Sequence, residues 1–522
     1  MSKLFSKIEP VVFFPVFILL IGVTVGGLVN YNGLLNFLLV AFEWTTDTFG
    51  WIYTIIAITM LVLCVVFFIH PLGKTKFGGP DAKPEMSTFA WFSVTLTTSI
   101  GVALILWGSI EPVTHFMNPP TWAGVEAGSE AAASFATSQV ALHWAFNQYA
   151  VYTVAGIVAG LAHFNYGRPM APSSGLYWAI GDNKLACNIV DALCLITCVG
   201  GMATSMGTGI VQIATGAHYA LPIIPDNNMT QLIVAVVIVF LYTFACCSGV
   251  DKAMSVISNF NVYVYIFLLA FVVVIGPTVF MGQLGMQSLG ELFNSGIRRS
   301  FMTSPFGDSW VDNWTINFYL SIAVYVPIMG LFFAKIARGR TIRAFIGMDF
   351  FICSIFNIIW IDIFGGAAIF EQVKNLVDLN GIMQTEGLQA AAFAFFNVYP
   401  LKSILVPLFA LAIFLSFVTM GQSLVTTFAA MSMKGGLSAN ETMPSKPLMI
   451  LFGVFIGAFA YILLGLMGVD VIKYTYMVVG FPIFIIMLLE IYSLLKWAFF
   501  PDFSIKKAMK EGKAAKLESV EP

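Results

Sequence analysis

The stretch from Asp312 to Arg343 reads DNWTINFYLSIAVYVPIMGLFFAKIARGRTIR. Residues 314–336 form an apolar run of the length that crosses a bilayer, about 20 residues, and their one charged side chain is Lys335 near its end. Pro327 interrupts helical hydrogen bonding inside the run. Arg338, Arg340 and Arg343 follow it, as expected at a cytoplasmic membrane surface. The stretch therefore predicts a broken transmembrane helix that ends in the cytoplasm.

The whole chain shares this apolar character. Of its 522 residues, 59% are hydrophobic and 10% are charged, and the mean hydropathy is +0.88, whereas soluble domains carry about 25% charged residues. We expect an all-α membrane protein with twelve transmembrane helices, because twelve apolar runs of sufficient length occur at 12–30, 50–70, 88–110, 141–163, 186–215, 231–248, 254–282, 314–336, 343–370, 397–428, 447–468 and 471–498.

The distribution of basic residues tests this count. If the N-terminus lies in the cytoplasm, the inside segments hold 20 of the 25 lysines and arginines. Cytoplasmic loops carry an excess of such residues, and a miscounted span would reverse every later loop. We therefore expect a multi-pass protein of the cell inner (cytoplasmic) membrane with its N- and C-termini in the cytoplasm.

The spans group into five predicted regions. Spans 3 and 8 each contain a break, at Ser99–Ala103 and at Pro327 with Gly330, and each could open an inverted five-helix repeat. Glycines within spans also serve helix packing, which is the alternative explanation. The predicted regions are 1–85 (two peripheral helices and a cytoplasmic linker), 86–282 (first repeat, spans 3–7), 283–313 (outer interfacial helix and loop), 314–500 (second repeat, spans 8–12) and 501–522 (cytoplasmic tail).

The chemistry-bearing residue types do not predict an enzyme. No glycine-rich phosphate loop follows a strand, and the five histidines are scattered along the chain. The seven cysteines lie in or beside spans and lack metal-site spacing with histidine. No basic tract indicates nucleic acid as a partner. We therefore expect no resident metal or cofactor, and partners limited to a small-molecule solute and the lipid bilayer.

Aromatic side chains concentrate near the predicted span centres. Their faces attract quaternary ammonium groups by cation–π interaction, although interfacial belts and core packing also use such residues. In span 4, positions 144, 148, 149 and 152 are neighbours on a helix and could line one face. The residues in question are Trp144, Gln148, Tyr149 and Tyr152 in span 4, Trp107 in span 3 and Tyr325 in span 8.

Five segments resemble one known family. They are GSIEPVTHF at 108–116, His143-Trp144 with the later tyrosines, TSMGTGIVQ at 204–212, IFGGAA at 363–368, and the two ends of the 312–343 stretch, WTIN and AKIARGR. Together they are similar to the betaine/choline/carnitine transporter family. That resemblance implies a LeuT-type fold, a homotrimer, and alternating access around a central aromatic box.

The resemblance implies a modified solute wall. The family's span 8 tryptophans are replaced by Tyr319, Ser321 and Ile322, and Ala103 stands where a glycine or, in choline carriers, an aspartate is expected. The pocket should thus be amphipathic, and a purely cationic solute is less favoured. The predicted solute-binding residues are Trp107, Trp144, Tyr149, Tyr152, Ser321, Ile322, Tyr325 and Met329, with Ser99 and Gly101 at the span 3 break.

The predicted function is secondary active transport, by symport or exchange, of a small quaternary-ammonium, sulfonium or related zwitterionic solute. The alternative is an ion-coupled carrier of the same fold for a non-methylated amino acid or a sulfonate such as taurine. Competition by unmethylated amino acids would favour the alternative.

Two kinds of coupling group are candidates. Na⁺ is the candidate coupling ion, with its ligands at the family's sodium positions, Thr97, Ile100, Thr419 and Met420, although a thioether at Met420 suits this hard cation poorly. Asp362 in span 9 is a candidate proton-coupling group, because a carboxylate within a membrane is costly. Its alternative role is that of a carboxylate near the span end that reaches water.

Overall fold

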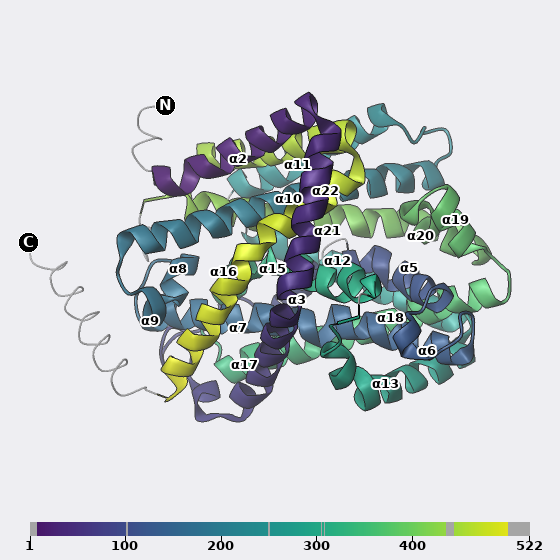
Figure 1. Cartoon of the computed structure of the whole chain (residues 1–522), viewed down its shortest axis with the longest axis horizontal. Coiled ribbons are helices and arrows are strands. Elements are labelled where there is room, and N and C mark those ends of the chain that lie inside the picture. Colours follow the sequence, from purple (N-terminus) through teal and green to yellow (C-terminus); the bar gives the residue numbers. More distant parts are fainter. Residues whose placement is uncertain are drawn as a thin grey trace, which may run out of the picture.

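The computed structural model describes residues 8–100, 103–248, 251–303, 305–306, 308–434 and 443–499. The regular elements in these ranges are helices (Figure 1), so the prediction of an all-α protein is confirmed. Two isolated β-bridges, Ile8 to Met433 and Lys76 to Thr341, tie loops together.

The α-helices, in chain order, are α2 (Pro10–Val29), α3 (Tyr31–Ile69), α4 (Thr88–Ile100), α5 (Ala103–Met117), α6 (Glu130–Leu142), α7 (Gln148–Gly160), α8 (Pro172–Gly175), α9 (Tyr177–Ile180), α10 (Lys184–Ala220), α11 (Asn228–Ser248), α12 (Asp251–Ile275), α13 (Thr278–Ser300), α14 (Ser309–Val311), α15 (Asn317–Ala323), α16 (Val326–Ile336), α17 (Ile342–Ile346), α18 (Cys353–Val373), α19 (Leu379–Thr385), α20 (Leu388–Ala394), α21 (Lys402–Met431) and α22 (Lys446–Phe499). Short 3₁₀ turns are η1 (Pro71–Lys74), η2 (Thr121–Ala123) and η7 (Phe395–Val398). Wider π-helical turns are η3 (His143–Asn147), η4 (Leu161–Asn165), η5 (Asp312–Ile316) and η6 (Gly347–Ile352).

Many of these helices are long and apolar enough to cross a membrane. Within the described ranges, nine single helices qualify, and each of two bent helix pairs adds one span, which gives up to eleven. The last two predicted runs fall within α22, where Val478–Phe499 qualifies and Lys446–Ile462 is a shorter apolar helix. A multi-span membrane protein is therefore confirmed, and the count of twelve and the paired repeats stay predictions.

Some boundaries differ from the predicted ones. Helix α3 begins at Tyr31, whereas the second apolar run was predicted to begin at residue 50. The helix continues through the polar residues that lie before that run. Helix α12 ends at Ile275 and α13 begins at Thr278, although the predicted seventh span continued to residue 282. Gly276 and Pro277 separate the two helices, since proline lacks the backbone N–H that would continue α12.

The two bent pairs are spans 3 and 8. Thr88–Ser99 and Ala103–Met117 meet at 59°, and Ser309–Ala323 and Val326–Ile336 meet at 53°. Positions 101 and 102 lie outside the described residues, so nothing is assigned to Gly101. In span 8 the break precedes Pro327, which occupies the first turn of α16. Pro327 has no N–H to donate to the carbonyl oxygen of Ala323, and its ring would clash with that carbonyl in a continuous helix, which explains a break just upstream.

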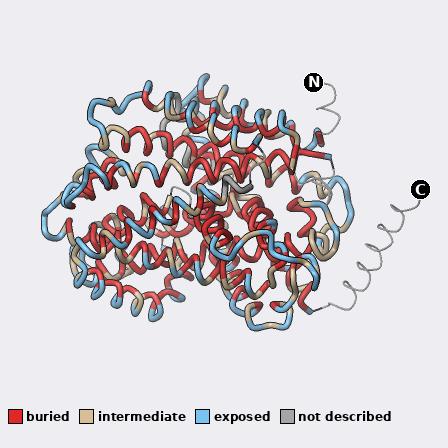
Figure 2. Tube along the Cα trace, turned by 180° about the vertical axis from the view of Figure 1, so that it is seen from behind, coloured by how far each residue is buried: buried red, intermediate tan, exposed pale blue. Residues whose placement is uncertain are grey.

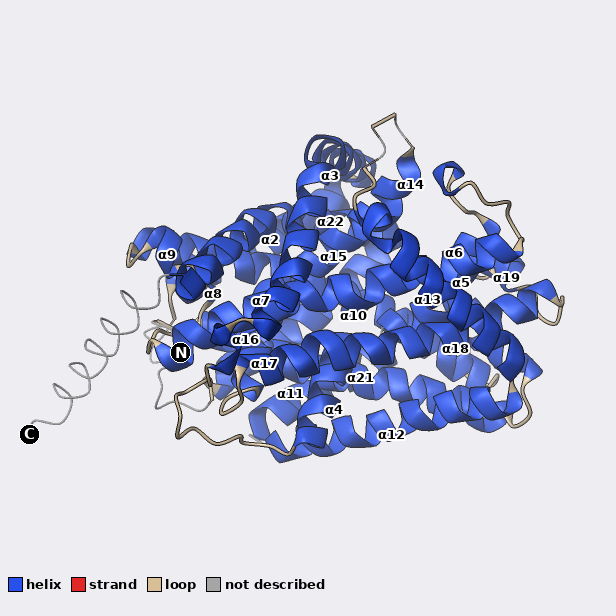
Figure 3. Ribbon diagram, turned by 90° about the horizontal axis from the view of Figure 1, so that it is seen from below, coloured by secondary structure: helices blue, strands red, loops and turns tan. Residues whose placement is uncertain are grey.

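Burial places span 4 at the centre of the bundle and α2 and α11 at its edge. In the most apolar window of each helix, 94% of the Glu130–Asn165 residues are buried, against 28% for α2 and α11. Figure 2 shows the same gradient, with buried segments inside and exposed ones around the rim. In Figure 3, α4 lies beside α12 at one edge of the bundle. The side chains of span 4 are therefore the natural place to look for a buried site.

Helix α13 is amphipathic and is held to α6 by a buried guanidinium. Phe293 and Ile297 are exposed on one face, while Arg299 on the other donates to Ser138 Oγ at 3.0 Å and to the Phe135 carbonyl oxygen at 3.4 Å. Burial lowers the pKa of the Arg299 guanidinium to about 10, so it stays charged at neutral pH. These charge-assisted hydrogen bonds fix α13 against α6.

Replacing Arg299 by Ala should therefore destabilise the protein by about 2 kcal/mol, the typical worth of hydrogen bonds to a charged group. The measurement is the thermal unfolding midpoint of purified protein in detergent. The matched control is Arg298→Ala, because that neighbouring side chain is exposed. Equal midpoints for the two variants would contradict the assigned role of Arg299.

Candidate functional site

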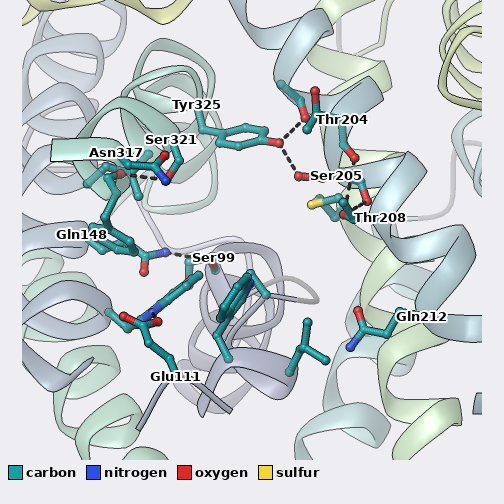
Figure 4. Close-up of a pocket in the computed structure, with 18 of the residues that line it drawn as sticks. Ser99, Glu111, Gln148, Thr204, Ser205, Thr208, Gln212, Asn317, Ser321 and Tyr325 are labelled. Carbon is teal, nitrogen blue, oxygen red and sulfur yellow. Dashed lines mark hydrogen bonds between the residues drawn. The ribbon is translucent and has the colours of Figure 1, made fainter. Parts of the chain in front are cut away.

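A cavity of about 550 Å³ lies between the two broken spans and the helices α7 and α10. Figure 4 shows side chains from all of these elements converging on it. Residues from α20 and α21 complete its lining, including Gln389 and Phe417. Because breaks in both spans border the cavity, backbone and side-chain polar groups are presented inside an otherwise apolar bundle.

Most of the predicted solute-binding residues meet at this cavity. Those that line it are Ser99, Trp107, Trp144, Tyr152, Ser321, Ile322, Tyr325 and Met329. Tyr149 does not line it, and Gly101 lies outside the described residues. Their common location is a finding, and their binding of solute stays a prediction.

Tyr149 lies behind the wall. Its side chain is fully buried, and its hydroxyl oxygen is 2.9 Å from Ser99 Oγ. The reason is helical geometry: Trp144, Gln148 and Tyr152 are four residues apart and stay on one face, whereas a further single residue turns the side chain by about 100°. Tyr149 therefore supports the broken span from behind.

The hydroxyl-bearing side of the cavity belongs to α10. Tyr325 donates its phenolic hydrogen to the Gly201 carbonyl oxygen at 2.5 Å, and Ser205 Oγ lies 2.6 Å from the same phenol. Thr208 Oγ1 donates to the Ser205 carbonyl oxygen at 3.0 Å. These residues form a polar patch opposite the aromatic rings (Figure 4).

Two amides leave polar atoms unpaired at the cavity. Gln148 Nε2 donates to the Ser99 carbonyl oxygen at 3.0 Å. Its Oε1 and Gln212 Nε2 are buried and have no hydrogen-bond partner in the part of the chain that the structure describes. Both residues line the cavity. Buried polar atoms are normally satisfied, so these two are available to a polar group of a solute.

The aromatic side surrounds a carboxylate. Trp144 and Phe318 meet edge to face with centroids 4.9 Å apart, and Trp107 meets Trp314 in the same way at 6.2 Å. Trp144 Nε1 donates to Glu111 Oε2 at 2.6 Å. Glu111 also lines the cavity and was not among the residues predicted to do so. The segment GSIEPVTHF already contained this acid, eight residues and about two turns beyond Ala103.

Glu111 also contacts two buried histidines. Its Oε1 is 2.9 Å from His143 Nδ1 and 3.4 Å from His115 Nε2. The ligand-type atoms of the three residues all lie within 4.8 Å of one another. Because the carboxylate already accepts hydrogen bonds from both rings and from Trp144, we assign this arrangement to hydrogen bonding.

The candidate sodium ligands are placed on α4 and α21. Thr97 Oγ1 donates to the Ser93 carbonyl oxygen at 2.8 Å and Thr419 Oγ1 to the Leu415 carbonyl oxygen at 3.0 Å. Met420 lines the cavity, and the Ile100 side chain is outside the described part of the chain. A sodium site at these positions stays a prediction.

Asp362 lies away from the cavity. A Cβ added to Gly285 on α13 would be 3.4 Å from its carboxylate, so the acid faces α13. It is not among the residues that line the cavity, and its Oδ1 has no hydrogen-bond partner among the described residues. A role for Asp362 in proton coupling remains untested.

Comparison with known proteins points to one class of transporter. The family description "BCCT, betaine/carnitine/choline family transporter" matches residues 10–499. The chain is 32% identical to the ectoine/hydroxyectoine transporter of Virgibacillus pantothenticus, over 87% of this chain and 89% of that protein. It is 31% identical to a probable glycine betaine transporter of Desulfitobacterium hafniense, over 87% and 90%. It is 28% identical to the glycine betaine transporter OpuD of Bacillus subtilis, over 93% of each chain.

Proposed function

The chain belongs to the betaine/carnitine/choline family of transporters, and from this premise we propose which solute it carries and how. It is a membrane transporter and not an enzyme. The proposed solute is a small quaternary-ammonium, sulfonium or related zwitterionic compound, moved across the cytoplasmic membrane by alternating access. Relatives described as transporters of ectoine and of glycine betaine support this solute class.

The observation that carries the proposal is the two-sided cavity. Indole and phenyl rings of α5, η3, η5 and α15 line one side, and the hydroxyls of Ser205, Thr208 and Tyr325 line the other. A zwitterion has one end for each side. Onium groups favour aromatic faces, and a carboxylate accepts hydrogen bonds from amides and from hydroxyls, whose O–H bonds rotate away from their present acceptors when a better one is bound. Gln212 Nε2, which has no hydrogen-bond partner among the described residues, is a further donor for the carboxylate.

The first test is a thermal-shift panel on purified protein, with and without sodium. Glycine betaine, carnitine, choline, ectoine, a sulfonium zwitterion, taurine and plain amino acids would be compared. A ligand at about a hundred times its Kd stabilises by about 2.7 kcal/mol, so glycine betaine or ectoine should raise the unfolding midpoint by several degrees. If none of the compounds shifts the midpoint, the proposed function is wrong.

The alternative solute class gives a different pattern in the same panel. Stabilisation by taurine or by unmethylated amino acids alone would favour the ion-coupled carrier that the sequence left open. Ser321 and Ile322, where the family has indoles, are the residues that favour this alternative, because they line the cavity and reduce its aromatic area.

Coupling, assembly and orientation are proposed from the family resemblance. Na⁺ is the proposed coupling ion, since Thr97 and Thr419 supply hydroxyls at the matching positions. A homotrimer of the LeuT-type fold, with both termini in the cytoplasm, is the proposed assembly. Loss of the thermal shift on removing sodium, and the mass of the purified oligomer, would test the coupling ion and the trimer.

A further inference from the structure

Glu111 is a buried acid without a basic counter-charge. Only 3% of the residue is exposed. Within the described part of the chain, its ion-pair partners within 4.0 Å are the histidines His115 and His143, and no lysine or arginine is among them. Burying an uncompensated carboxylate is costly, and in a membrane such a group is a functional candidate by default.

Both ring nitrogens of His143 lie within hydrogen-bonding distance of neighbouring side chains. Its Nδ1 is 2.9 Å from Glu111 Oε1, which can only accept from it when ionised. Its Nε2 is 3.0 Å from the Gln139 amide nitrogen, a donor, and 3.1 Å from Thr315 Oγ1. These contacts tie the ring to α6 and η5 as well as to the carboxylate, and within the described residues no lysine or arginine joins the two histidines as an ion-pair partner of Glu111.

Charged groups on the surrounding elements face elsewhere. Asp312 on η5 faces Gly50 of α3, Asp362 on α18 faces α13, and Arg299 on α13 bonds to α6. None of them offsets the charge on Glu111. Other acids on neighbouring elements also have partners of their own. Asp349 accepts from Thr153 on α7, Glu130 accepts from Gln287 on α13, and Glu386 accepts from Tyr219 on α10. Asp47 on α3 lies near Asp312, Glu371 lies beside Tyr399, and Asp378 caps the start of α19.

Glu111 reaches the solute space directly and through Trp144. The carboxylate is part of the cavity lining, on the side away from the α10 hydroxyls (Figure 4). Its Oε2 accepts the indole N–H of Trp144 at 2.6 Å. Donation of that N–H to an anion polarises the hydrogen bond and leaves more electron density on the ring face, which strengthens cation–π attraction.

We propose that Glu111 is the counter-charge for the positive end of the solute and so determines specificity: the protein selects solutes that carry an onium or amidinium group. This inference rests on the proposed function and narrows its solute class. The aromatic rings provide a surface of complementary shape and dispersion attraction. Glu111 attracts the positive end of the solute, so a solute of the same shape without a positive end gains nothing from it. The hydroxyls of α10 receive the opposite end.

The test compares two ligands of one shape. Glycine betaine and tert-butylacetate differ only in that a carbon replaces the quaternary nitrogen of the betaine. Dissociation constants would be measured by calorimetry on purified wild type and on Glu111→Gln, which keeps the side-chain length and an oxygen acceptor for Trp144. Two unit charges a few ångströms apart near a protein surface interact by several kcal/mol, so Glu111→Gln should weaken glycine betaine roughly a hundredfold and tert-butylacetate hardly at all.

The matched control is Glu371→Gln. Glu371 is also buried in the bundle, with 1% of the residue exposed, but it is not part of the cavity lining. This variant should keep the wild-type preference for glycine betaine. Equal weakening of both ligands in Glu111→Gln would mean that Glu111 only supports the wall, and it would overturn the proposal.

A second measurement needs no variant. Wild-type protein should bind glycine betaine roughly a hundredfold more tightly than tert-butylacetate, because only the betaine carries the positive charge that Glu111 attracts. Equal affinities for the two ligands would contradict the proposal. Failure of both ligands and of the whole solute panel to bind would instead refute the proposed function.

Discussion

Trp144→Ala is expected to weaken binding of an onium solute by about 2–3 kcal/mol, which is roughly 30- to 150-fold in Kd. A ring face in a desolvated site contributes up to about 2 kcal/mol of cation–π attraction. The substitution also removes the indole N–H that now lies 2.6 Å from Glu111 Oε2, so the carboxylate is no longer held in place at the aromatic wall. The measurement is calorimetric titration of glycine betaine or ectoine.

Trp144→Phe separates the two contributions, because it keeps a ring and removes the N–H. Its affinity should lie between wild type and Trp144→Ala. The matched control is Trp51→Ala on α3, where 53% of the residue is exposed on the outer surface of the bundle. Trp51→Ala should bind as wild type does. Wild-type affinity in Trp144→Ala would show that this wall is structural only.

Gly330→Val is expected to prevent stable packing of α16 on α7. A Cβ at Gly330 would lie 2.6 Å from the Ala155 Cβ and 2.8 Å from the Ala155 carbonyl carbon. Backbone atoms of a central helix cannot move aside, and overpacking of this kind costs about 1–3 kcal/mol or more. We expect a lower unfolding midpoint and a smaller fraction of monodisperse protein on size exclusion. Gly330→Ala should show the same effect more weakly.

The control for glycine replacement is Gly22→Ala on α2, where an added Cβ meets nothing within 4 Å. Alanine is favoured over glycine within a helix by up to about 1 kcal/mol. This variant should therefore be as stable as wild type or slightly more stable. If Gly330→Val also matched the wild type, the close approach of α16 and α7 would not contribute to stability.

The fold class followed from the sequence because the membrane imposes a strong rule. Backbone polar groups have no water to pair with there, so long apolar runs must become helices. Boundaries were less predictable. Hydropathy alone does not show that a helix extends beyond its apolar run, as α3 does from Tyr31. It also does not show that a continuous apolar run is divided into two helices, as happens at Gly276 and Pro277.

Part of the candidate site could be predicted from the sequence. The four-residue spacing of Trp144, Gln148 and Tyr152 predicted a shared face, and all three line the cavity. Tyr149 was grouped with them without allowance for its rotation about the helix axis. Glu111 was missed because its importance depends on contacts from η3, which are 32 and 33 positions away in sequence. The pattern of residues within α5 does not predict these contacts.

The π-helical turn at His143–Asn147 has a consequence for insertions and deletions. Such a turn holds one residue more than an α-helical turn, so it absorbs an extra residue within a single turn. Deleting one residue there would restore an α-turn and nearly keep the orientation of Gln148 and Tyr152. The same deletion elsewhere in span 4 would rotate all that follows by about 100° and take both side chains out of the cavity while hydropathy stayed unchanged. Alignments of related chains should therefore place single-residue length changes of span 4 at this turn.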